Sequence, residues 1–156
     1  MMAMNTFPQS EYQIGGSQRP VEHALFDRSR GDSRLGWLKA IFNGKKRMPA
    51  LSERIAGRAV RAQHALGPRS VEIEQITGTE SRADDFDPDF NPRDDRMRER
   101  WVHIAWLRLR GVNLPAVDLI QVGSEYFVRD GHHRISVARA LGNAYIDAQV
   151  TLIELV

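Results

Sequence analysis

Residues 130–142 read DGHHRISVARALG, and this stretch decides the fold because it predicts the end of a strand and the start of a helix. The apolar residues 126–128 (YFV) before it are typical of a strand. Within the stretch, Ile135, Ala138 and Leu141 recur at helical spacing before a closing glycine. The sequence therefore predicts a strand that leads almost directly into a helix, with a pair of histidines at the junction.

Around this junction, the pattern of apolar residues predicts a mixed α/β (α+β) fold for the C-terminal half. Alternation of apolar and polar residues indicates strands, and a spacing of three to four residues indicates helices. We expect strands at residues 71–74, 116–122 and 146–152, and helices at residues 34–43, 49–66 and 96–110. The acidic sequence of residues 79–95 predicts a long loop. Long loops are uncommon in a compact domain, and we expect this one to be functional or mobile.

These elements divide the chain into three predicted segments. Residues 1–30 show no periodicity and predict a flexible N-terminal arm, residues 31–69 predict a basic helical hairpin, and residues 70–156 predict the α/β domain. A packed hairpin is favoured over a DNA-binding helix-turn-helix, although the spacing of the two helices does not separate them.

The composition is that of a globular protein, with 42% hydrophobic and 27% charged residues among 156. The chain contains no cysteine, which excludes disulfides, Cys-based zinc sites and thiol nucleophiles. No apolar run approaches the length of a membrane span, and the N-terminus lacks the pattern of a signal peptide. We therefore expect a cytoplasmic protein with no membrane partner.

Charge is unevenly distributed along the chain. Residues 28–69 hold 11 Lys/Arg against 2 Asp/Glu, a net charge of +9, whereas residues 70–156 have a net charge of −5. Attraction of a polyanion or docking of one half on the other would each account for this asymmetry. If DNA is a partner, the residues expected to contact it are Lys45, Lys46, Arg47, Arg54, Arg58 and Arg61.

The junction at residues 130–134 has the chemistry of an anion site. The first N–H groups of a helix have no acceptor within the helix, and the helix dipole favours negative charge there. Gly131 would let a ligand approach the backbone, and His132 and His133 would add donors and positive charge. Arg134 can hold phosphate oxygens in pairs, and Asp130 could cap the helix, hold a histidine tautomer or help to place Mg²⁺. The alternative is that Asp130 is only a capping residue and Arg134 only a surface residue.

The same stretch, DGHHRISVARALG, resembles the phosphate-binding box of ParB-type domains, in which a GxRR or GHHR core precedes a helix with small residues and then Leu-Gly. The glycine and proline of residues 111–115, the β-hairpin expected over residues 116–128 and the last strand follow the same order, so the resemblance covers about residues 71–152. It implies a small ParB/sulfiredoxin-like mixed-sheet domain that binds a nucleotide (CTP, ATP or ADP), with Mg²⁺ as a further expected ligand. Sulfiredoxin chemistry requires a cysteine in this box, so that activity is not expected.

The resemblance leaves more than one function open. One is a regulatory nucleotide-binding module of bacterial type, with DNA as a further partner. Another is a nucleotide-dependent phosphotransferase acting on a small hydroxyl acceptor, as in free-serine kinases, with Glu80 as the base and Arg82 as a second phosphate contact. A ParB-like nuclease is a third alternative, which would need a carboxylate cluster for its metal ions.

Resident metals other than Mg²⁺ are not expected. Residues 85–91 place four oxygen-bearing side chains at calcium-loop spacing, but Phe90 and Arg96 stand where the loop needs glycine and glutamate. His132 and His133 are adjacent and lack the spacing of zinc ligands. We expect neither zinc nor haem, and the sequence leaves the oligomeric state open.

Overall fold

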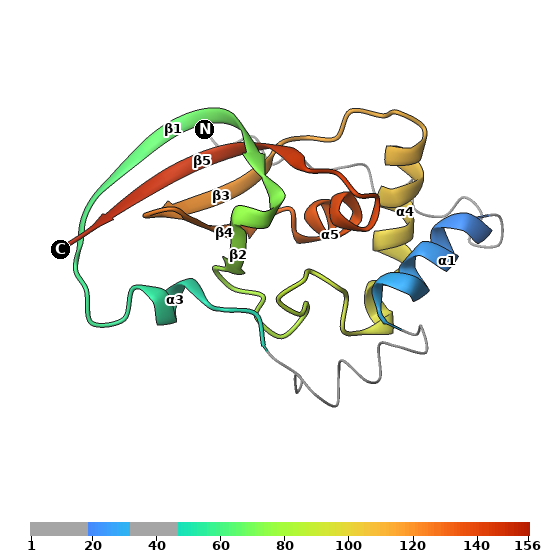
Figure 1. Ribbon diagram of the computed structural model, residues 1–156, viewed down its shortest axis with the longest axis horizontal. Helices are drawn as coiled ribbons and strands as arrows, with labels where there is room; N and C mark the ends of the chain where they lie inside the picture. Colours follow the sequence, from blue (N-terminus) through green and yellow to red (C-terminus); the bar gives the residue numbers. More distant parts are fainter. Residues whose placement is uncertain (1–18, 32–46) are drawn as a thin grey trace.

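The computed structural model describes residues 19–31 and 47–156 of the chain, and it shows a mixed sheet with helices packed beside it (Figure 1). The predicted α/β class is confirmed. The helices are α1 (Pro20–Ser29), α3 (Leu51–Arg54), α4 (Arg98–Leu109), α5 (His132–Ala140) and two 3-10 turns, η2 (Ile73–Gln75) and η3 (Asp95–Met97). The strands are β1 (Val60–Glu72), β2 (Ile76–Thr79), β3 (Val117–Val122), β4 (Glu125–Asp130) and β5 (Tyr145–Leu155).

The five strands lie in the order β1-β5-β3-β4-β2. The pairs β1/β5 and β3/β4 are antiparallel, and the pairs β3/β5 and β2/β4 are parallel. The parallel pair β2/β4 sets Thr79 opposite Val128, two residues before the end of β4. This register brings the end of β2 next to the junction between β4 and α5, although about 50 residues separate them in sequence.

One prediction for this part of the chain is wrong: the expected helix at residues 49–66 is the short helix α3 followed by the long strand β1. The strand expected at residues 71–74 is confirmed for residues 71–72, which end β1, whereas residues 73–75 form η2. Pairing along the whole of β5 stabilises β1 and overrides the weak helical periodicity of its sequence. The other expected helix of the hairpin, residues 34–43, lies outside the described residues.

The segment expected to be a flexible arm contains α1. Its Phe26 is fully buried and meets Trp101 of α4 edge to face, with ring centroids 5.5 Å apart. Arg98 of α4 forms an ion pair with Asp27 at 2.7 Å. One aromatic residue thus anchors a short helix that has no strong amphipathic pattern of its own.

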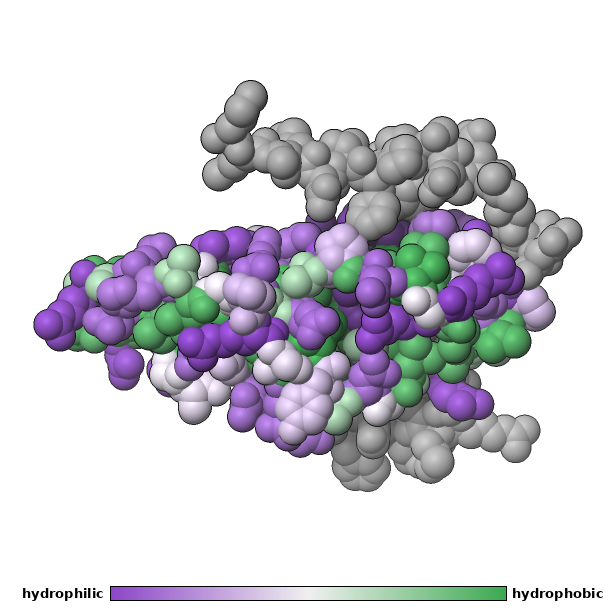
Figure 2. Space-filling view, turned by 90° about the horizontal axis from the view of Figure 1, so that it is seen from above, coloured by the Kyte–Doolittle hydropathy of each residue, from purple (hydrophilic) through white to green (hydrophobic). Residues whose placement is uncertain are grey.

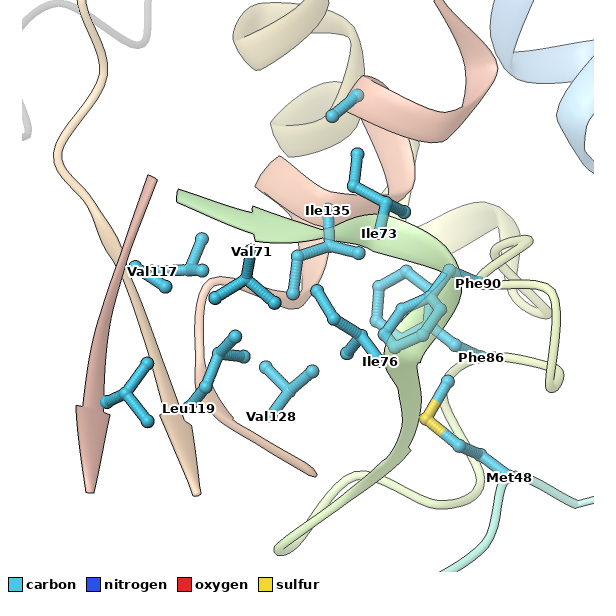
Figure 3. Close-up of a cluster of buried hydrophobic side chains, with 13 residues drawn as sticks. Met48, Val71, Ile73, Ile76, Phe86, Phe90, Val117, Leu119, Val128 and Ile135 are labelled. Carbon is cyan, nitrogen blue, oxygen red and sulfur yellow. The ribbon is translucent and has the colours of Figure 1, made fainter. Parts of the chain in front are cut away.

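The main core lies between the sheet, α5 and the loop that follows β2 (Figure 3). Val71, Leu119 and Val128 come from three strands and face Ile135 of α5. Burial of such side chains contributes about 1.5–3 kcal/mol each. The core therefore fixes α5 against the sheet, and six of its nine residues are buried.

The acidic loop is packed rather than detached. Phe86 and Phe90 are buried beside Ile76 (Figure 3). The carboxylate of Asp87 accepts hydrogen bonds of 2.9 Å from the backbone N–H groups of Asp89 and Asn91. On the face of the molecule seen in Figure 2, hydrophilic residues cover much of the described surface, with hydrophobic patches between them.

Candidate functional site

The site is built on the first turn of α5. Gly131 is the N-cap residue, with φ of 103°, and no side chain caps the helix. The first hydrogen bond of the helix runs from the N–H of Ile135 to the carbonyl of Gly131 at 3.0 Å. The preceding N–H groups of the first turn have no acceptor within the helix, so the turn presents donors and the positive end of the helix dipole.

Gly131 has a packing role that the sequence did not reveal. A Cβ at this position would lie 2.5 Å from Cγ1 and 2.8 Å from Cβ of Val117 on β3. The positive φ also disfavours any residue with a side chain. The absence of a side chain therefore allows α5 to begin close against the sheet, and the contact of Gly131 with a ligand stays a prediction.

The two histidines are buried and neutral. His132 and His133 are 4% and 7% exposed, and the ring of Phe86 stacks on the first and meets the second edge to face. Burial lowers the pKa of His132 to about 4 and that of His133 to about 3, with nearby arginines adding to the effect. The prediction that these imidazoles bring positive charge is wrong at neutral pH, because the protein interior disfavours the charged form.

Arg134 is held by the protein around it. One of its terminal nitrogens donates to the carbonyls of Pro115 and Ala116 at 2.6 and 2.8 Å, and the other donates to Asp130 at 2.7 Å. The interpretation of Asp130 as a helix cap is wrong, because its carboxylate pairs with Arg134 and does not bond the helix N–H groups. The guanidinium therefore ties the start of α5 to the segment before β3.

A shallow recess, open to solvent, lies at this turn. Its lining is formed by Arg82, Arg100, Ile104 and residues 130–134. Among the described residues, three arginines against the one carboxylate of Asp130 give the recess a net positive charge. Arg82 comes from the loop after β2 and Arg100 from α4, so the charge converges from three separate elements.

The structure brings Arg82 into the recess but not Glu80. The carboxylate of Glu80 pairs with Arg129 of β4 at 3.2 Å, and Glu80 is not part of the lining. Arg82 has a long contact of 3.4 Å with Asp85, and almost half of its side chain is exposed. Of the two loop residues predicted to serve the site, only the arginine lies where a phosphate could reach it.

Sequence reasoning missed Thr79 and Arg100. The Oγ1 atom of Thr79 lies 2.7 Å from Nε2 of His132, and both residues are buried. The 53 residues between them carry no local pattern that would predict the contact. Arg100 was one arginine among several on a predicted helix, and only the packing of α4 beside α5 shows which of them faces the recess.

Among the basic residues predicted to contact DNA, the four that the structure describes do not share a helix. Arg47 pairs with Asp84 at 3.4 Å, and Arg54 of α3 pairs with Glu125. Arg58 precedes β1, Arg61 lies within it, and Lys45 and Lys46 fall outside the described residues. The prediction that these residues lie on a common helical surface is therefore wrong. Contact with DNA stays a prediction that rests on charge alone.

Within residues 19–31 and 47–156, no three His, Cys, Asp or Glu side chains gather as they would around a metal ion. Of the recess residues that the structure describes, Asp130 has the one carboxylate that could share a divalent cation with a bound phosphate. None of the described helices is both long enough and apolar enough to span a bilayer.

Comparison with known proteins adds a distant structural likeness. No family model and no curated protein matches the chain. Among solved structures, sulfiredoxin from Arabidopsis thaliana is similar over 53% of this chain and 82% of its own, with 21% sequence identity and a TM-score of 0.33. A likeness of this extent says nothing about the site, which is therefore judged on its own geometry.

Proposed function

We propose that the recess at the start of α5 binds the phosphate group of a nucleotide. The observation that carries this proposal is the uncapped first turn of a nine-residue helix, which opens on a recess lined by Arg82, Arg100 and Arg134. Free backbone donors and guanidinium groups are the partners that phosphate oxygens prefer. The resemblance of residues 130–142 to the ParB-type phosphate box supports the same assignment.

A second recess supports a nucleotide rather than free phosphate. It is open to solvent and shares Arg134 with the first recess. Its walls include the apolar Leu114, Pro115 and Ile146, and Asp147 and Arg108 add polar groups. An apolar wall with a few polar groups suits a nucleoside, so a ligand could place its phosphate on one side of Arg134 and its base on the other.

The proposal is limited to binding, with a regulatory role. The phosphotransferase alternative needs a free base near the bound phosphate, and Glu80 is paired with Arg129 outside the recess. Mg²⁺ would join the complex through the nucleotide, because such ions take most of their ligands from phosphate oxygens and water. Asp130 would be the protein's contribution to that ion.

The test is calorimetric titration of the full chain with CTP, ATP, ADP and inorganic pyrophosphate, with and without Mg²⁺. Replacement of Arg100, an exposed arginine of the recess, by Gln should weaken binding about tenfold or more, because a hydrogen bond to a charged group contributes about 1.5–3 kcal/mol. Arg58→Gln is the matched control, since it removes the same charge from an exposed position outside the recess.

Two results would contradict the proposal. A folded wild-type protein that binds none of these ligands excludes a phosphate site at ordinary nucleotide concentrations. Equal loss of affinity in Arg100→Gln and Arg58→Gln shows that binding follows overall charge and does not occur at the recess.

A further inference from the structure

A buried hydrogen bond links the end of β2 to the first residue of α5. Thr79 is fully buried at the last position of β2, and its Oγ1 atom lies 2.7 Å from Nε2 of His132. Either atom could donate, so the direction of the bond depends on what else the hydroxyl does. That direction decides which nitrogen of the imidazole carries the proton.

The other contacts of the hydroxyl settle the direction. Its oxygen already accepts hydrogen bonds from the backbone N–H groups of Ser81 and Arg82, at 3.3 and 3.1 Å. A hydroxyl has two lone pairs and one proton, so a third accepted bond from His132 would exceed its capacity. The proton of Thr79 has two candidate acceptors, the carbonyl of Val128 at 3.4 Å and the imidazole nitrogen at 2.7 Å. The hydroxyl of Thr79 therefore donates its proton along the shorter contact, and Nε2 of His132 accepts this hydrogen bond.

The proton of the neutral His132 ring then lies on Nδ1. No hydrogen bond to this nitrogen is formed among residues 19–31 and 47–156. His132 also lines the recess. A buried ring that lines the recess and has an unused donor can supply that donor to an acceptor bound there.

We propose that Thr79 is a positioning residue that fixes His132 in the Nδ1–H tautomer, so that this N–H donates to a phosphate oxygen bound in the recess. The proposal rests on the phosphate-binding function argued above and deepens it by assigning His132 a neutral donor role. The ligand class is an acceptor-only oxyanion, such as the terminal phosphate of a nucleoside diphosphate or triphosphate. The arginines neutralise the charge of the phosphate, and the N–H of His132 donates a hydrogen bond that orients it.

The first experiment records the tautomer in the ligand-free protein. Long-range ¹H–¹⁵N spectra of the imidazoles distinguish Nδ1–H from Nε2–H, and they are compared for wild type, Thr79→Ser and Thr79→Val. We expect Nδ1–H at His132 in wild type and in Thr79→Ser, which retains the hydroxyl, and a mixture of tautomers in Thr79→Val. An Nε2–H tautomer in wild type overturns the inference whether or not the protein binds nucleotide.

The second experiment measures ADP affinity in the same proteins. Loss of the bond should weaken ADP binding about threefold to tenfold in Thr79→Val, as expected for one neutral hydrogen bond, and Thr79→Ser should restore it. Unchanged affinity in a Thr79→Val protein that has lost the tautomer overturns the positioning role. Absence of ADP binding in a wild type with the Nδ1–H tautomer refutes the proposed function, and with it the phosphate contact.

If Thr79→Val does not fold, a second pair of variants tests the same inference. The side-chain amide of Asn can place its N–H near the position of Nδ1, whereas the longer Gln places it near Nε2. His132→Asn should therefore retain ADP affinity better than His132→Gln. The reverse order overturns the inference.

Discussion

Acid should destabilise this protein through its two buried histidines. The pKa of His132 is lowered from 6.5 to about 4, and that of His133 to about 3, chiefly by burial. Between pH 6.5 and about 4 the unfolded chain therefore binds more protons than the folded one, and the free energy of unfolding falls as the pH falls. Above pH 6.5 both rings are neutral in either state, and this contribution to stability is fully present.

The size of the effect follows from the shifts. Each pKa unit corresponds to about 1.4 kcal/mol, so lowering the pH from 6.5 to 4 should cost up to about 3 kcal/mol for each histidine. That is a large share of the roughly 5–15 kcal/mol by which a domain is stable. We expect the unfolding midpoint in urea to drop steeply through this window.

The assay is urea unfolding at half-unit steps from pH 7 to pH 4, in chloride buffers without phosphate. The control is a double variant, His132→Asn with His133→Gln, which has no ionisable ring at either position. The carboxylates and the other histidines are the same in both proteins. The difference between their slopes of unfolding free energy against pH therefore reports on His132 and His133. Equal slopes would refute the reasoning, as would an NMR titration of either ring with a pKa near 6.5.

Three further changes have defined outcomes. Gly131→Ala should destabilise the protein by about 2–4 kcal/mol in urea unfolding, because it adds a positive-φ penalty to a clash with Val117; a loss below about 1 kcal/mol would contradict the close packing. Glu80→Gln should leave ADP affinity within about twofold by calorimetry, since a hydrogen-bond partner outside the recess contributes little to binding; a large loss would return this residue to the site. Trp101→Phe should cost about 1–3 kcal/mol in the same unfolding assay by leaving the hydroxyl of Ser136 without its 2.8 Å partner, and a neutral effect would argue against that bond.

Local sequence patterns predicted the part of the fold where neighbours along the chain decide the structure. The helix at residues 96–110, the hairpin of β3 and β4, and the strand leading into α5 are confirmed, because their periodicity and closing glycines act over a few residues. Residues 60–66 show the limit of this reasoning. Their apolar spacing fits a helix, yet pairing with residues 151–155 makes them a strand.

The features of the site also fall into those that follow from local sequence and those that follow from tertiary packing. The sequence by itself determined that a strand-to-helix turn with Gly131, two imidazoles and Arg134 would present backbone donors, since these features follow from adjacent residues. Only the tertiary structure decided that the imidazoles are buried and neutral and that Arg100 completes the charge. It also decided that Thr79 faces His132. The physical reason is that desolvation, charge convergence and buried hydrogen bonds depend on which distant segments pack together, and the order of residues along a chain does not encode that locally.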